Sequence, residues 1–132
     1  MFNIFMKRKG ITGILFILIL LAVGLFFLSQ YQDNNNIRTR FDRNLGPLIF
    51  TRHAKCRMAC RHIDESEIRE ILHNGKINTD KSEPDAKPDP KFALEGTTHD
   101  NQQVRVIFAP SNRGMVVITC IDLDTEWQCD CR

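Results

Sequence analysis

An uninterrupted apolar segment near the start of the chain constrains its folding more than any other feature. Residues 11–28 (ITGILFILILLAVGLFFL) contain no charged side chain, and Thr12 is the only strongly polar residue among them. A helix of this length crosses most of the hydrocarbon core of a bilayer and satisfies its own backbone hydrogen bonds there. We therefore expect a single transmembrane helix over residues 11–28.

Basic residues in front of the apolar segment predict its orientation. Lys7, Arg8 and Lys9 precede it directly, and such charges are typical of the cytoplasmic flank. A cleaved signal peptide is the alternative, but the apolar run is longer than usual for one, and bulky residues (FFLSQYQ) follow where small ones would precede a cleavage site. We expect an uncleaved signal anchor in the cell membrane, with residues 1–10 cytoplasmic and the remainder outside, on the periplasmic side.

The exported part divides into a tether and one small domain. Residues 29–46 are polar and show no hydrophobic period, which predicts a tether between membrane and domain. The domain is expected over residues 47–132. At its start Thr51 can cap a first helix over 52–62. A capping-box pair, Asp64 with Glu67, begins a second helix.

The second half of the domain has the periodicity of a sheet. After a charged, proline-rich loop at 80–91, apolar residues alternate in segments that begin at Phe92, Val104 and Met115. The apolar run 48–50 predicts a further short strand before the helices. The expected fold is α+β, with two short helices packed on a sheet of three or four antiparallel strands.

Charge and motifs exclude several functional classes. The 18 basic and 16 acidic residues give a net charge of +2, which is too balanced to predict nucleic-acid binding from bulk electrostatics. The sequence also lacks a glycine-rich phosphate loop, a nucleophile elbow and a dinucleotide fingerprint. No cofactor is therefore expected, apart from zinc if the cysteines are reduced.

Five cysteines lie in the expected domain. Cys56 and Cys60 share a face of the first helix, Cys129 and Cys131 lie at the C-terminus, and Cys120 lies in the last strand. In an oxidising compartment such cysteines predict a disulfide framework. Residues this close in sequence rarely bridge each other, so helix-to-tail pairing is the economical arrangement. The alternative is a metal site made of the four paired thiolates.

A polar stripe on the first helix carries the candidate chemistry. His53, Arg57 and Arg61 recur at intervals of four and so lie on one helical face. Imidazole can move a proton near neutral pH, and guanidinium can hold a phosphate. Arg105 could contribute if its side chain reaches the open face of the sheet. A solvated helix face, with Arg57 paired to a carboxylate of the next helix, is the alternative.

The opening of the domain resembles a known family. The segment Thr51-Arg-His-Ala-x-x-Arg-Met, with later strands ending in Val-Val-Ile-Thr, is similar to a widespread bacterial domain-of-unknown-function family that opens with Ser/Thr-x-His-Ala-x-x-Arg. The resemblance covers about residues 47–123. It implies a fold similar to the RelE and barnase-like toxin nucleases, which cleave RNA. Carried over, it implies His53, Arg57, Arg105 and Thr119 as catalytic residues.

The anchor and the two cysteine pairs depart from that family's pattern. An RNase tethered outside the cytoplasm would meet no cellular RNA, so the setting favours a binding or structural domain of the cell envelope. The membrane is then the one expected partner. The alternatives are a phosphodiesterase of the RelE/barnase type, with nucleic acid as substrate, and a metal-binding protein that uses Cys56, Cys60, Cys129 and Cys131.

Overall fold

The computed structural model describes the backbone of residues 2–132 and the side chains of residues 12–132. The expected cytoplasmic segment, residues 1–10, lies outside the residues whose side chains are described. The chain divides into two units, one that ends at Asn36 and a compact one, Ile37–Arg132.

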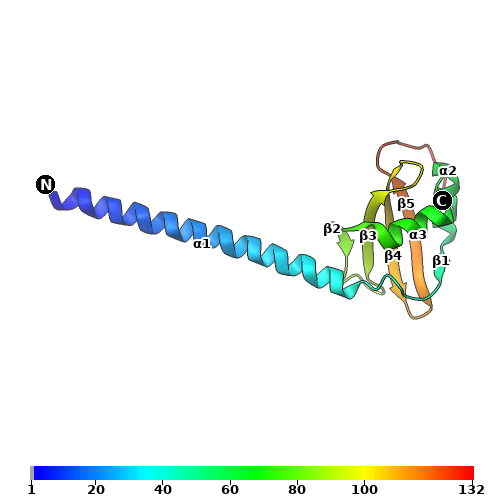
Figure 1. The fold of residues 1–132 in the computed structure, drawn as a ribbon, viewed down its shortest axis with the longest axis horizontal. Helices are drawn as coiled ribbons and strands as arrows, with labels where there is room; N and C mark the ends of the chain where they lie inside the picture. Colours follow the sequence, from blue (N-terminus) through cyan, green and yellow to red (C-terminus); the bar gives the residue numbers. More distant parts are fainter. Residues whose placement is uncertain (1) are drawn as a thin grey trace. The chain divides into compact units, whose positions relative to one another are not determined.

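Helix α1 (Phe2–Arg40) contains the apolar segment (Figure 1). Over Thr12–Arg40 it includes a stretch with a mean hydropathy of 2.7, none of which is buried. Its large apolar side chains between Ile14 and Leu28 are 46–67% exposed. Contact with water would be unfavourable for so much apolar surface. The chain thus has a helix long and apolar enough to span a membrane, a property that signal sequences share.

The end of α1 differs from the expected tether. Residues 29–40 continue the helix, and Ile37 and Phe41 are buried in the core of the compact unit. The Phe41 ring lies 4.9 Å from that of Phe92. Arg43 then donates hydrogen bonds to the carbonyls of Leu72 and two neighbouring residues at the end of α3. The compact unit therefore begins at Ile37 rather than at residue 47, because two apolar residues are too few to produce a hydrophobic period.

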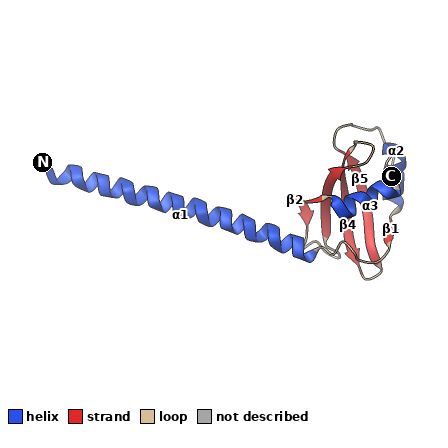
Figure 2. Cartoon of the chain, in the orientation of Figure 1, coloured by secondary structure: helices blue, strands red, loops and turns tan. Residues whose placement is uncertain are grey.

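The compact unit is an α+β domain, as expected, built on one mixed sheet (Figure 2). Its strands lie in the order β1-β5-β4-β3-β2. Their bounds are Leu48–Phe50 (β1), Lys76–Glu83 (β2), Lys91–Thr97 (β3), Gln103–Ser111 (β4) and Gly114–Asp122 (β5).

The sheet differs from the expected three or four antiparallel strands in two respects. Strand β1 pairs in parallel with β5, whereas the other neighbours are antiparallel. Strand β2 (KINTDKSE) is a fifth strand, and it overlaps the segment expected to be a loop. It lies at the edge of the sheet, where polar and charged side chains are common, so it lacks the alternating apolar pattern of the other strands.

The two short helices form as their sequences predict. Helix α2 (Arg52–Arg61) is capped by Thr51, whose hydroxyl accepts from the Ala54 N–H and donates to the Ile118 carbonyl. Helix α3 (Glu65–Asn74) begins with a complete capping box between Asp64 and Glu67. Both helices therefore begin at residues that local sequence specifies.

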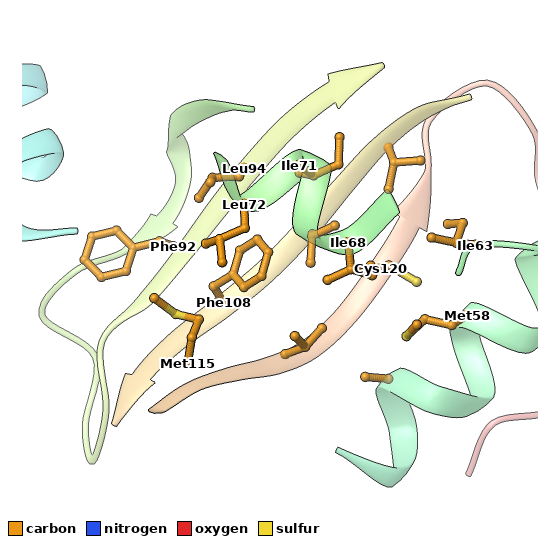
Figure 3. Packing of buried hydrophobic residues seen from close by; sticks show 14 of the residues in the cluster. Met58, Ile63, Ile68, Ile71, Leu72, Phe92, Leu94, Phe108, Met115 and Cys120 are labelled. Carbon is orange, nitrogen blue, oxygen red and sulfur yellow. The ribbon is translucent and has the colours of Figure 1, made fainter. Parts of the chain in front are cut away.

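Helix α3 covers one face of the sheet (Figure 3). Its buried residues Ile68, Ile71 and Leu72 join a core that includes Phe92 and Phe108. Helix α2 packs against β5 and adds Ala54 and Met58 to the same core. The strand residues that alternate with the core positions point to the opposite face, where they are half-buried; they include Arg105, Ile107, Thr119 and Ile121.

Candidate functional site

Two disulfides tie the C-terminal tail to α2. Cys56 is bonded to Cys131 and Cys60 to Cys129, with Cα–Cα distances of 5.7 and 5.9 Å. The first helix cysteine pairs with the last tail cysteine, so the tail runs antiparallel to the helix. This is the expected helix-to-tail pairing. Disulfide sulfurs are not thiolates, so the four-thiolate metal site would require their reduction.

The fifth cysteine takes no part in this framework. The Cys120 thiol is free and fully buried in the core. Burial raises its pKa to about 11, despite the nearby guanidinium of Arg61. It therefore packs as a small apolar residue, which is the usual role of a buried free cysteine.

A pocket lies between α2, the end of β5 and the start of the tail. Its volume is about 490 Å³, and it is open to solvent. Arg57 and Arg61 line it from α2, Ile121 and Asp122 from β5, and residues 123–127 from the tail. The pocket therefore depends on the path of the tail, which the two disulfides fix.

Asp122 organises the tail wall of this pocket. Its carboxylate accepts hydrogen bonds from the indole N–H of Trp127 at 2.8 Å, from the backbone N–H groups of Asp124 and Thr125, and from the Gln102 amide. Burial acts to raise the pKa of Asp122, but these hydrogen bonds outweigh burial and lower it below its ordinary value. Asp122 is thus a fixed anion that holds Trp127, so its charge is already compensated.

The two arginines of the pocket have donors to spare. Arg61 donates through one terminal nitrogen to the Cys120 carbonyl, but its buried Nε has no hydrogen-bond partner. The Arg57 Nε donates to Nε2 of His53 at 3.4 Å. Neither arginine forms an ion pair with any side chain described over 12–132. The alternative pairing of Arg57 with an α3 carboxylate is therefore not formed.

The four residues that the family resemblance implied as catalytic lie in two groups. His53 and Arg57 are in contact on α2. Arg105 and Thr119 lie on the face of the sheet away from α3, where the Arg105 Nε donates to Glu95 at 2.5 Å. Strand register places Arg105 opposite Ile121, which lines the pocket. Within residues 12–132, no hydrogen bond or ion pair joins one group to the other.

Asp122 and Gln102 were not singled out from the sequence. The missed pattern is the segment Asp-Leu-Asp-Thr-Glu-Trp directly after the last strand, in which the first carboxylate can accept from backbone groups two and three residues later. Trp127 packs against the end of α2, where its ring lies 5.3 Å from that of His62.

Comparison with known proteins identifies one family. A family model described as "Domain of unknown function (DUF4258)" matches residues 50–122. The match includes α2, α3 and the strands β2–β5, but neither the apolar helix nor the tail that carries Cys129 and Cys131. No curated protein and no solved structure gives a match. The expected similarity to the RelE and barnase-like nucleases is therefore not confirmed.

Proposed function

This chain belongs to the DUF4258 family of domains of unknown function, and we propose that it is a membrane-anchored member that binds an anionic group in the pocket beside α2. In this proposal α1 is an uncleaved single-pass anchor, and the domain lies outside the cytoplasm.

Two features support the location. The large apolar side chains of α1 between Ile14 and Leu28 are exposed. The disulfides Cys56–Cys131 and Cys60–Cys129 persist in oxidising compartments, whereas cytoplasmic thiols are kept reduced. Both features, together with the basic residues before the apolar segment, favour a domain on the outer side of the membrane.

A topology assay tests the location separately from binding. Reporters that are active only inside or only outside the cytoplasm are fused after Arg132 of the full chain. We expect activity from the outside reporter alone, and membrane association that resists extraction with salt. A soluble, released fusion would contradict the anchor, and activity from the inside reporter would contradict the orientation.

The observation that carries the binding proposal is that two arginines, Arg57 and Arg61, line one pocket without an ion pair to any side chain described over 12–132. Guanidinium groups bind carboxylates and phosphates through paired N–H donors. An anionic group of the ligand in the pocket would supply acceptors for these donors. Asp122 does not supply them, since its oxygens already accept from Trp127, Gln102 and the tail backbone.

Binding can be followed without a label, because Trp127 is the only tryptophan and lines the pocket. The full chain in mild detergent is titrated with inorganic phosphate at constant ionic strength. We expect a saturable change in Trp127 fluorescence that is lost in Arg57→Ala. It should be retained in Arg52→Ala, which removes an exposed arginine of α2 outside the pocket. An equal response in both variants, or none in the wild type, would refute the proposal.

A second candidate is hydrolysis of phosphodiesters, favoured by the contact between His53 and Arg57. In this candidate His53 acts as general acid and base, Arg57 and Arg105 stabilise charge on the phosphate, and Thr119 orients the substrate. The substrate is then a nucleic acid. His53→Ala should abolish cleavage of single-stranded RNA without lowering the melting temperature. An equal fall in melting temperature would instead assign His53 a structural role, and absence of cleavage by the wild type would exclude the candidate.

A further inference from the structure

A second group of ligating side chains lies where the first turn of α3 meets the turn between β3 and β4. One ligand atom from each of Glu67, His99 and Asp100 lies within 4.8 Å of the other two. Glu67 comes from α3, whereas His99 and Asp100 come from the turn. None of these three residues lines the pocket beside α2, so this group is separate from the proposed anion site.

Glu67 is the unusual member of the group. Its side chain is only 1% exposed, and its Oε2 accepts from the Asp64 N–H at 3.0 Å in the capping box. Its other oxygen, Oε1, is buried and has no hydrogen-bond partner. No lysine or arginine with a described side chain forms an ion pair with this carboxylate. A buried carboxylate oxygen without a hydrogen-bond partner is unfavourable, and a bound cation would compensate it.

His99 is held in a suitable orientation. Its Nδ1 lies 3.2 Å from Oε2 of Glu70, which also accepts from the backbone N–H of His99. Nε2 points toward Asp100, with 3.7 Å to its Oδ1. In metal sites the second ring nitrogen of a histidine ligand is commonly bonded to a carboxylate, which fixes the tautomer and the ring. Glu70 provides that carboxylate on α3.

We propose that Glu67, His99 and Asp100 bind one divalent zinc ion, with Glu70 as the residue that positions His99. One imidazole nitrogen and two carboxylate oxygens are ligands that zinc accepts, and three protein ligands leave a fourth position for water. Calcium and magnesium prefer six or more oxygen ligands, so the imidazole favours zinc. The ion would link the β3–β4 turn to the start of α3 and neutralise the buried Glu67.

Zinc titration of the full chain in mild detergent tests this proposal. The titration uses protein without a histidine tag and with intact disulfides, so that the buried Cys120 is its only thiol. A chromophoric chelator reports zinc by competition. We expect one zinc per chain, loss of this binding in His99→Ala, and an affinity lowered about 10-fold or more in Glu70→Gln. His73→Ala, which removes an exposed histidine at the other end of α3, should bind as the wild type does.

Two further measurements distinguish loss of the proposed site from misfolding and from zinc binding at the cysteines. Asp100→Asn changes an exposed residue without loss of volume, so this variant should fold as the wild type does and bind zinc more weakly. Unchanged zinc affinity in both Asp100→Asn and His99→Ala would overturn the proposal. X-ray absorption of the zinc-loaded protein should show nitrogen and oxygen neighbours. Sulfur neighbours would place the ion at the cysteines and would equally overturn it.

Discussion

Removal of the two disulfides singly and together should give strongly non-additive losses of stability. The bridges are nested: Cys60–Cys129 closes a loop of 69 residues and Cys56–Cys131 one of 75. Each alone restricts the unfolded chain by closing that long loop. Once one bridge is present, the other closes only a small additional ring through the few residues that separate the two pairs.

The loop lengths set the expected magnitudes. In the chain-entropy model, a single bridge across a loop of 69 or 75 residues contributes about 4.4 kcal/mol. The second bridge closes a ring of about six residues and contributes about 2 kcal/mol. Replacement of one cysteine pair by serine should therefore destabilise the domain by about 2 kcal/mol, whichever pair is removed, and replacement of both by about 6 to 7 kcal/mol. Because small domains are stable by roughly 5–15 kcal/mol, the chain without either bridge should be close to unfolding.

Urea unfolding of the full chain in mild detergent, followed by far-ultraviolet circular dichroism, measures these losses. The double-pair variant should lose about three times as much free energy of unfolding as either single-pair variant. A loss of about 4 kcal/mol for each pair, with the two losses simply additive, would show that unfolded-chain entropy does not explain the stabilisation. Such a result would mean that each bridge acts through contacts of the folded tail rather than through the entropy of the unfolded chain.

Three further predictions concern the compact unit. Gly114→Ala should destabilise the compact unit by about 2 kcal/mol or more in urea unfolding. Gly114 has φ +140°, and an added Cβ would lie 2.3 Å from the Pro47 carbonyl oxygen. Gly24→Ala is the matched control, because a Cβ added there would have no atom within 4 Å. Burial acts to raise the pKa of Asp122, but its hydrogen bonds outweigh burial and lower this pKa below its ordinary value. The ionised Asp122 carboxylate therefore stabilises the fold at neutral pH, and this stabilisation is lost as the pH falls through the folded-state pKa. The urea midpoint should therefore fall less in Asp122→Asn than in the wild type between about pH 6 and pH 3, and parallel curves would contradict this. Since burial raises the pKa of Cys120 to about 11, the native protein should resist iodoacetamide at about pH 8 and react only when unfolded, whereas rapid native labelling would show that the thiol is accessible.

The elements that the sequence predicted are those with local determinants. Thr51 caps α2, and the Asp64–Glu67 pair begins α3, because cap residues bond backbone groups within three positions. The alternating strands after Phe92 followed from their period of two. These patterns are complete within a few residues, so no knowledge of the rest of the fold is needed to find them.

The elements that the sequence did not predict depend on partners distant in the chain. The parallel pairing of β1 joins Leu48–Phe50 to residues Met115–Val117, which come after both short helices and three other strands. Ile37 and Phe41 become core residues only because α1 continues into the compact unit. Neither feature leaves a periodic pattern in the sequence.

The candidate sites divide in the same way. Contact between His53 and Arg57 follows from their spacing of four on a helix. Helix-to-tail pairing was predicted because cysteines this close in sequence rarely reach disulfide geometry with each other. In contrast, the approach of Glu67 to His99 joins a helix to a turn that packs on it, and no spacing in the sequence indicates that contact.

A thiol count on the chain taken directly from cells tests whether it carries a disulfide-linked domain in an oxidising compartment. The cells are lysed in denaturant with a maleimide polyethylene glycol that adds a fixed mass at each free thiol, with and without prior reduction. We expect one adduct, at Cys120, without reductant and five after reduction. Five adducts without reductant would rule out the oxidised domain, because the four paired cysteines would then be free thiols in the cell.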